Sequence, residues 1–198
     1  MPSTPTGCVS SRHARARSLS AACSTARSAG AHYEVNGACV RTEPGGGRPP
    51  IWFGGRSEHV LRLAADLGEG WITATNASPE EVGRGRARLR ELLRAAGRSP
   101  DAVAVAVPFV ARVAATTERA RADIETYIER GAFQGAVKQF LDDGTRAHGV
   151  WGSPEDCARR LEPYLELGVN GVILDVRPPE FALDSVERIC RDLIPLLQ

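Results

Sequence analysis

A short apolar segment that runs into paired glycines and then into a helix start most constrains the fold of this chain. Residues 48–57 read RPPIWFGGRS, and residues 67–73 read LGEGWIT. Residues 51–53 are typical of a strand, Ser57 of a helix N-cap and Gly68 of a helix end. A strand that reaches a helix N-terminus through glycines brings free backbone N–H groups to the positive end of the helix dipole. That arrangement suits a phosphate.

After residue 51 the pattern alternates between strands and helices. Strands are expected at residues 51–53, 70–73, 103–107 with a continuation past Pro108, and 171–175. Helices are expected at residues 57–67, 78–96, 117–130, 153–167 and 185–197. Serine, proline and two acidic residues begin the helices at Ser78 and Ser153, which is a typical capping signal. Strands that alternate with helices of this length indicate parallel βα units.

About four such units fit the chain, which is half of the eight in a (β/α)8 barrel. Residues 131–149 fit no unit and are expected to form an extra loop with a short helix.

Residues 1–31 differ from the rest of the chain. They are rich in Ser, Ala and Arg, and the first acidic residue of the chain is Glu34. The segment has almost no large apolar side chain, so it cannot bury enough surface to offset the entropy of ordering. Its arginines imitate a mitochondrial transit peptide, but we favour a disordered or non-native leader, such as out-of-frame translation. The expected organisation is therefore a leader over residues 1–31 and a folded domain over residues 32–198.

Composition narrows the classes of function. A net charge of +1 gives no electrostatic reason to bind nucleic acid or an anionic membrane. No apolar run approaches the ~20 residues of a membrane span. The arginines of residues 84–98 fit a solvated helix face, because no stacking aromatic accompanies them. The 5 cysteines and 4 histidines are scattered, so we expect a reduced, cytoplasmic protein without a metal site.

Three motifs follow one another along most of the chain: the strand end PPIWFGG, then GEGWI after the following helix, and the helix start GSPE at residues 152–155. Together they resemble the luciferase-like flavin and deazaflavin oxidoreductases, from about residue 33 to the end of the chain. The resemblance implies an α/β fold of parallel βα units, the C-terminal half of a (β/α)8 TIM barrel, preceded by the disordered leader. It implies FMN or the deazaflavin coenzyme F-420 as the cofactor, without choosing between them.

The family's N-terminal half is not recognisable in residues 1–31. The resemblance therefore implies a truncated oxidoreductase, of monooxygenase or hydride-transfer type, that supplies part of the cofactor phosphate pocket. Its catalytic residues are unknown and are expected in the missing half. In the intact enzyme the partner would be a small-molecule substrate.

Three alternatives stay open. The chain could be an inactive remnant or interaction module that pairs through exposed sheet edges. It could be one half of a split enzyme, completed as a homodimer or by a complementary half-barrel chain. It could also be a different (β/α)8 enzyme with convergent phosphate loops.

The candidate cofactor contacts lie in two βα loops. Gly54 and Gly55 would let the backbone approach a phosphate, although a tight turn alone would also explain them. Arg56 could add a charged contact or face solvent, and Ser57 is expected to serve first as an N-cap. The second loop consists of Thr73, Ala74 and Thr75, and its two threonine hydroxyls could donate to phosphate oxygens or be solvated.

Two further pairs stand near these loops. Trp52 and Trp71 are expected to fill the layer between the sheet and the helices. Asp175 and Arg177 stand at the end of the last strand, where an ion pair and a ligand-binding role are equally compatible with the pattern.

Overall fold

The computed structural model describes residues 26–38, 48–130 and 148–198. The chain divides into two compact units, Met1–Ile51 and Trp52–Gln198. Residues 131–147, where an extra loop was expected, lie outside the described residues.

The first unit contains a β-hairpin. Strand β1 (Ala26–Ala29) pairs antiparallel with β2 (Glu34–Ala38), and the Gly30 N–H donates to the Tyr33 carbonyl at 2.8 Å in the turn. Strand β1 lies in the segment that was expected to be a leader without regular structure. A hairpin of this kind is held by backbone hydrogen bonds and needs no large apolar side chain, so composition gave no sign of it. The rest of the expected leader, residues 1–25, lies outside the described residues.

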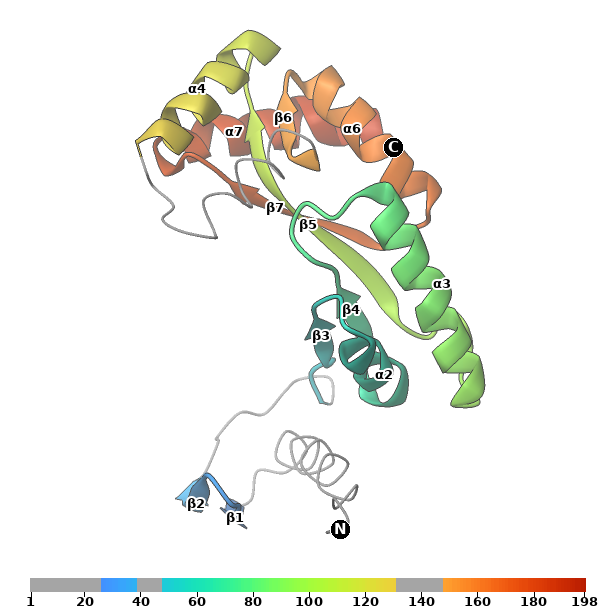
Figure 1. The fold of residues 1–198 in the computed structure, drawn as a ribbon. Coiled ribbons are helices and arrows are strands. Elements are labelled where there is room, and N and C mark those ends of the chain that lie inside the picture. Colours follow the sequence, from blue (N-terminus) through green and yellow to red (C-terminus); the bar gives the residue numbers. More distant parts are fainter. Residues whose placement is uncertain (1–25, 39–47, 131–147) are drawn as a thin grey trace. The chain divides into compact units, whose positions relative to one another are not determined.

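The second unit is a five-stranded sheet with helices between its strands (Figure 1). The strands are β3 (Trp52–Gly54), β4 (Gly70–Ile72), β5 (Ala104–Val113), β6 (Val150–Gly152) and β7 (Gly171–Val176). The sheet runs β3-β4-β5-β6, and β7 also pairs with β5. All the pairs are parallel, as the alternating pattern predicted.

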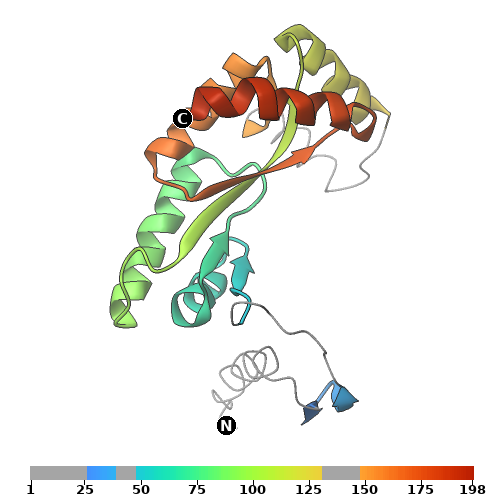
Figure 2. The same ribbon diagram turned by 180° about the vertical axis from the view of Figure 1, so that it is seen from behind.

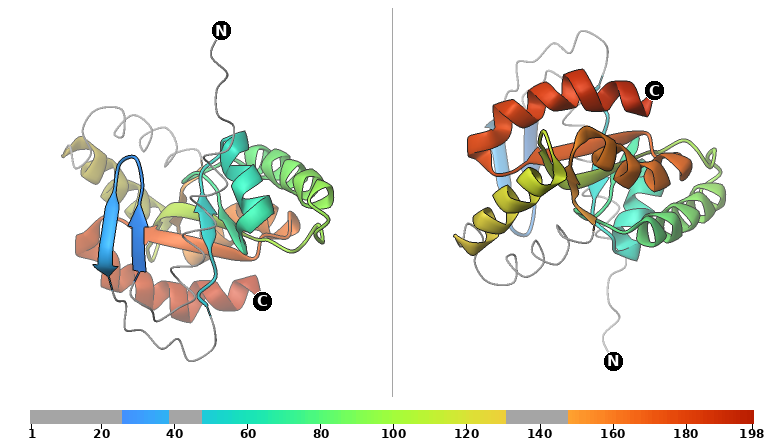
Figure 3. Two further views of the ribbon diagram at one scale, coloured as in Figure 1. Left: turned by 90° about the horizontal axis from the view of Figure 1, so that it is seen from below. Right: turned by 90° about the horizontal axis from the view of Figure 1, so that it is seen from above.

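Each strand of this sheet is followed by a helix. The helices are α2 (Glu58–Leu67), α3 (Pro79–Ala95), α4 (Thr117–Glu129), α6 (Pro154–Glu166) and a C-terminal run of η1 (Pro179–Phe181), α7 (Ala182–Arg188), η2 (Ile189–Leu193) and η3 (Ile194–Leu197). Helices α2 and α3 lie side by side (Figure 3). In the C-terminal run, α7 packs against β5 and β7, and η2 and η3 pack against α6 (Figure 2). Within the described ranges, no helix is long and apolar enough to cross a bilayer.

The sheet beside α2 and α3 has one covered face and one open face. Phe53, Trp71 and Val105 are aligned by the strand register and belong to one core cluster with these helices. On the other face Trp52 is 40% exposed and Ile173 is 44% exposed. The expectation for the tryptophans is therefore confirmed for Trp71, which is 2% exposed, and wrong for Trp52. Neighbouring residues of a strand point to opposite faces, so Trp52 cannot share the face that buries Phe53.

Strand β5 covers the region in which the sequence predicted a strand with a continuation past Pro108. It continues through Pro108, although proline cannot donate a hydrogen bond to the strand ladder. Pro108 is in register with Ile173 of β7, and its carbonyl accepts a hydrogen bond from the Asn76 N–H at 2.8 Å. Strand β5 therefore links the loop after β4 to the last strand.

Candidate functional site

The turn between β3 and α2 is held by two hydrogen bonds to β4. The Gly55 N–H donates to the Ile72 carbonyl at 3.0 Å, and the Gly55 carbonyl accepts from Trp71 Nε1 at 2.7 Å. Gly55 has a φ of 126°, a conformation that side-chain-bearing residues rarely adopt. The neighbouring strand therefore fixes both the position and the direction of this peptide.

Gly54 faces open space. A Cβ added at Gly54 would meet no atom of the described structure within 4 Å, whereas one at Gly55 would lie 3.5 Å from Val60 Cγ2. Gly54 shares its strand face with Trp52, the face that α2 and α3 leave uncovered. A ligand can approach the turn from this side.

Ser57 is the N-cap of α2, as the sequence indicated. Its Oγ accepts a hydrogen bond from the Val60 N–H at 3.3 Å, and its carbonyl accepts from the Leu61 N–H at 3.1 Å. The Glu58 and His59 amides precede the first intrahelical acceptor, so the helix itself offers them no partner. They stand at the positive end of the helix dipole.

In two other serine-capped helices, side chains of the protein bind the backbone N–H of the capping serine. At α3, the Ser78 N–H donates to Glu81 Oε2 at 3.1 Å, and the Glu81 N–H donates to Ser78 Oγ at 3.2 Å. At α6, the Asp156 N–H donates to Ser153 Oγ at 3.2 Å, and the Ser153 N–H donates to Thr117 Oγ1 at 3.0 Å. In both helices an acidic residue occupies the third helical position.

Helix α2 has Val60 at that position, which carries no acceptor, so the reciprocal closure of a capping box cannot form at Ser57. The acid in its first turn, Glu58, is bound by Arg62 at 3.1 Å and by Arg88 of α3 at 2.6 Å. The hydrogen bond from Arg88 lowers the pKa of the Glu58 carboxyl to about 2. The start of α2 therefore keeps free amides, and its own acid is paired with cations.

The loop after β4 contributes less donor capacity than the sequence suggested. Thr73 is 5% exposed, and its Oγ1 donates to the Ala74 carbonyl at 3.1 Å. The single proton of this hydroxyl is used in that bond, so toward a ligand Thr73 can only accept a hydrogen bond. The hydrogen bonds of Thr73 therefore do not support the expected donation to a phosphate. Thr75 is half-buried in the following turn.

Three of the candidate residues come together around a pocket of about 30 Å³. The pocket is lined by Arg56, Trp71, Thr73, Ala74, Ala77, Glu81 and Val82. It has room for little more than a water molecule. A larger hollow of about 300 Å³, lined by Arg121, Ile124, Glu125 and Trp151, contains none of the candidate residues. A cofactor-sized ligand would therefore lie on the open face of the sheet and not inside the small pocket.

Asn76 is part of this loop and was missed by the sequence analysis. It is 4% exposed with a φ of 54°, and its Oδ1 accepts from the Val110 N–H at 2.9 Å. Its Nδ2 is buried without a hydrogen-bond partner. Asparagine before a serine cap could have indicated the left-handed turn, since asparagine tolerates positive φ. Nothing local could have indicated the bond to β5.

The charged residues considered at the sequence level are bound to their own chain. Arg177 Nε lies 2.9 Å from Asp175 Oδ1, so the ion pair expected as one alternative is present. Arg90 of α3 pairs with Asp101 at 2.7 Å, and Arg98, just after α3, donates to the Gly68 carbonyl at 2.8 Å. These arginines join α3 to its surroundings within the unit.

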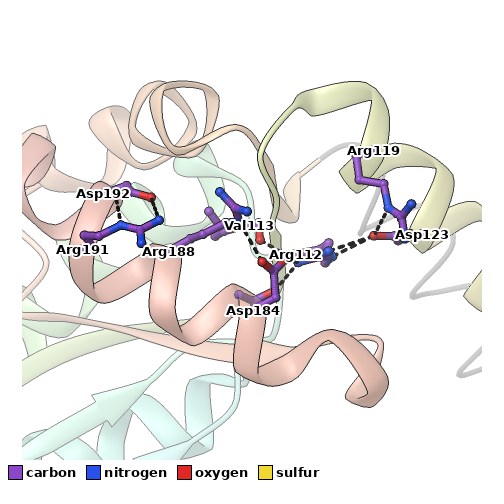
Figure 4. A network of polar contacts seen from close by, with 9 residues as sticks. Arg112, Val113, Arg119, Asp123, Asp184, Arg188, Arg191 and Asp192 are labelled. Atoms are coloured by element: carbon purple, nitrogen blue, oxygen red, sulfur yellow. Dashed lines mark hydrogen bonds and ion pairs between the residues drawn. The ribbon is translucent and has the colours of Figure 1, made fainter.

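A buried charged cluster at the end of β5 was not foreseen either (Figure 4). Arg112 is 2% exposed, and its guanidinium binds Asp123 of α4 at 2.9 Å and Asp184 of α7 at 2.9 Å. It also donates to Ser185 Oγ at 2.7 Å, and the Phe181 ring lies 4.8 Å from its Cζ. All three side-chain nitrogens have acceptors, so the cluster holds the fold and offers no donor to a ligand.

Within the described ranges, no group of three or more His, Cys, Asp and Glu side chains is placed to hold a metal ion.

Comparison with known proteins agrees with this architecture. The family model of luciferase-like monooxygenases matches residues 17–171, beginning inside the segment set apart as a leader. The 5,10-methylenetetrahydromethanopterin reductase of Archaeoglobus fulgidus is 24% identical over 84% of this chain and 59% of that protein. This chain thus spans less than two thirds of that relative's length.

Solved structures share the fold. One is an F-420-dependent secondary alcohol dehydrogenase with an F-420–acetone adduct, with a TM-score of 0.67, 18% identity and coverage of 100% of this chain and 64% of that chain. Another is the oxygenating constituent of 3,6-diketocamphane monooxygenase from Pseudomonas putida in complex with FMN, with a TM-score of 0.60, 17% identity and coverage of 87% and 58%. The expected parallel βα units of a TIM barrel are confirmed. From the family match and the shared fold, we conclude that the chain belongs to the luciferase-like monooxygenase family.

Proposed function

We propose that this chain acts in a luciferase-like oxidoreductase and supplies part of the site that holds the phosphate of FMN or coenzyme F-420. Family membership supports the oxidoreductase class. The relatives solved with an F-420 adduct and with FMN support these two cofactors, without favouring either. The bound cofactor would supply hydride transfer or, as reduced flavin, oxygen activation.

The observation that carries the proposal is the open N-terminus of α2. The turn at Gly55 leads into the cap residue Ser57. The third position of α2 carries no acidic side chain, whereas the third positions of α3 and α6 do. Backbone amides at the positive end of a helix dipole bind anions without further side chains. The exposed Arg56 adds a cation beside them.

The remaining candidate residues have supporting roles in this proposal. Gly54 leaves the open face of the turn free for the ligand to approach. Thr73, Ala74 and Thr75 form the adjoining wall, in which Thr73 offers an acceptor to a ligand hydroxyl or amide.

Two glycine substitutions test the proposal. Gly54→Ala introduces no clash, so its free energy of unfolding should stay within about 0.5 kcal/mol of the wild-type value. Its methyl group enters the space assigned to the ligand, and titration should show an affinity for FMN or F-420 about ten-fold lower, equivalent to ~1.4 kcal/mol. Gly55→Val should weaken binding as well and should also lower stability, because valine is strained at a φ of 126°.

Gly83→Ala is the matched control. Gly83 lies on α3, and an added Cβ there would make only an ordinary contact, 3.5 Å from Leu167 Cδ2. Its affinity for the cofactor should equal that of the wild type. Folded Gly54→Ala and Gly55→Val proteins that bind the cofactor normally would overturn the phosphate assignment.

A second candidate function is an interaction module that pairs through its sheet edges. Within the described residues, β3 pairs only with β4 and β7 pairs only with β5, and Trp52 and Ile173 are exposed on the sheet's open face. Unpaired edges and exposed apolar side chains recruit other chains. The partner would be a second copy or a complementary half-barrel chain. Light scattering after size-exclusion chromatography tests this candidate: a dimer or aggregate without turnover supports it, and a monomer that turns over a substrate rejects it.

A further inference from the structure

We infer that Trp71 is a positioning residue, which sets the phosphate turn through its indole N–H; the inference rests on the function proposed above. Trp71 Nε1 donates to the Gly55 carbonyl at 2.7 Å, from a side chain that is 2% exposed. The bond joins a buried residue of β4 to the one peptide that determines how the chain enters α2.

The indole itself has no freedom to move. It packs in a core cluster with Leu61 of α2 and with Leu89 and Leu93 of α3. Helix α3 passes so close that a Cβ on Gly85 would lie 2.4 Å from Trp71 Cη2. Because the ring is closely packed on all these sides, its N–H stays directed at the Gly55 carbonyl.

The direction of the Gly55 carbonyl decides which amides can face a ligand. In a trans peptide the C=O and the following N–H point in opposite directions, because the peptide unit is planar. The bond from Trp71 draws the Gly55 carbonyl toward the buried indole, so the Arg56 N–H points away from it. The Gly55 N–H is already bound to the Ile72 carbonyl at 3.0 Å. The phosphate donors are therefore the amides that follow Gly55, not the amide of Gly55 itself.

Without the indole N–H, the 55–56 peptide could rotate and direct its carbonyl oxygen toward the anion. That rotation would replace a donor by an acceptor and repel the phosphate. Trp71 thus acts on the ligand through Gly55 and Arg56 and need not touch the ligand.

The test compares FMN with riboflavin, which lacks the phosphate. Trp71→Phe keeps an aromatic ring in the core and removes the donor, so FMN affinity should fall about ten-fold, corresponding to one lost hydrogen bond. Riboflavin affinity should change less than about two-fold, because the turn has no phosphate to hold. Trp151→Phe, on β6, is the matched control and should change neither affinity. Coenzyme F-420 and its phosphate-free chromophore allow the same comparison.

If Trp71→Phe does not fold, a second variant with benzothienylalanine at position 71 takes its place in the test. This isostere of tryptophan keeps the bicyclic shape but lacks the N–H, so it should give the same selective loss. Equal losses for FMN and riboflavin, or no loss for either, would overturn the inference while a wild-type preference for FMN still stands. A wild-type protein that binds FMN no better than riboflavin overturns the proposed function and the inference together.

Discussion

The starts of α2 and α6 share a backbone plan but treat their free amides differently. Each helix follows a strand and a glycine with large positive φ, 126° at Gly55 and 136° at Gly152, and each has a serine cap. At α6 the space around the glycine is filled: a Cβ on Gly152 would lie 2.9 Å from Asp156 Cβ and 3.1 Å from Thr117 Oγ1. At α2 the neighbouring Gly54 faces open space.

The side chains explain this difference. Asp156 interacts with Thr117 and Arg159, so a carboxylate of the protein itself occupies the start of α6. Helix α2 has Val60 at the equivalent position, and its Glu58 is bound to Arg88. A glycine turn and a serine cap therefore do not by themselves mark an anion site. What distinguishes such a site is the absence of an internal acid that closes the cap.

We expect the greatest loss of stability at the buried charged cluster of Arg112, which joins β5 to α4 and α7. Arg112→Ala would leave Asp123, which is 8% exposed, in a buried site with one charge partner removed. The free energy of unfolding should fall by about 3–5 kcal/mol, the usual cost of breaking a buried ion pair. Urea denaturation measures the change. Arg121→Ala, which breaks the exposed pair with Glu125, is the control and should cost less than about 1 kcal/mol. Equal losses in the two variants would show that the Arg112 cluster does not hold the fold.

The next effect compares the two turns directly. Gly152→Ala combines an unfavourable φ with contacts below 3.4 Å and should cost about 2–3 kcal/mol. Gly55→Ala has a similar φ but meets only an ordinary contact, 3.5 Å from Val60 Cγ2, so it should cost about 1 kcal/mol less than Gly152→Ala. Gly54→Ala should cost less than about 0.5 kcal/mol in the same denaturation experiment. Equal costs for Gly55→Ala and Gly152→Ala would contradict the distinction between a filled and an open turn.

A third change converts the open cap into a closed one. Val60→Glu would place an acid three positions after Ser57 and complete a capping box. FMN affinity should fall about ten-fold through repulsion and loss of a free amide, while stability should change by less than about 1 kcal/mol. Val60→Ala removes the same apolar contact without closing the cap, and titration should give it wild-type affinity. A Val60→Glu protein that retains full affinity would exclude the amides of α2 as phosphate donors.

The smallest effect concerns pH. The folded-state pKa of Glu58 is about 2, below its ordinary value of 4.5, so its pairing stabilises the fold above pH 4.5. That contribution is lost as the pH falls from 4.5 toward 2. Urea unfolding of the wild type and Glu58→Gln should differ slightly at pH 7 and converge near pH 2. Arg88→Gln should remove most of the same pH dependence, because the hydrogen bond from Arg88 is its main cause.

Local sequence signals were sufficient for most of the second unit. The serine caps at Ser57, Ser78 and Ser153 begin helices where expected, and the strands after Gly70 and Gly171 lie within a residue or two of their predicted bounds. These features depend on neighbouring residues and on hydrophobic periodicity, which a single sequence contains.

The features that sequence reasoning missed depend on distant residues. Strand β6 has only three residues, too few to show a hydrophobic pattern. The side chain of Asn76 accepts a hydrogen bond from Val110, which lies 34 residues further along the chain on β5. Arg112 finds its acids on α4 and α7, and the Trp71 indole of β4 reaches Gly55 at the end of the neighbouring strand β3. The leader expected over residues 1–31 stays a prediction for residues 1–25.

An NMR titration of the ¹⁵N-labelled chain with FMN, following the amides at the starts of α2 and α6, tests whether α2 holds the phosphate. We expect saturable shifts for the Arg56, Glu58 and His59 amides, because these donors remain open to an anion. We expect no comparable shift for Glu155 and Asp156, whose helix start is already filled by side chains of the protein. Shifts confined to α6, or equal at both helix starts, would contradict the assignment of the phosphate site to α2.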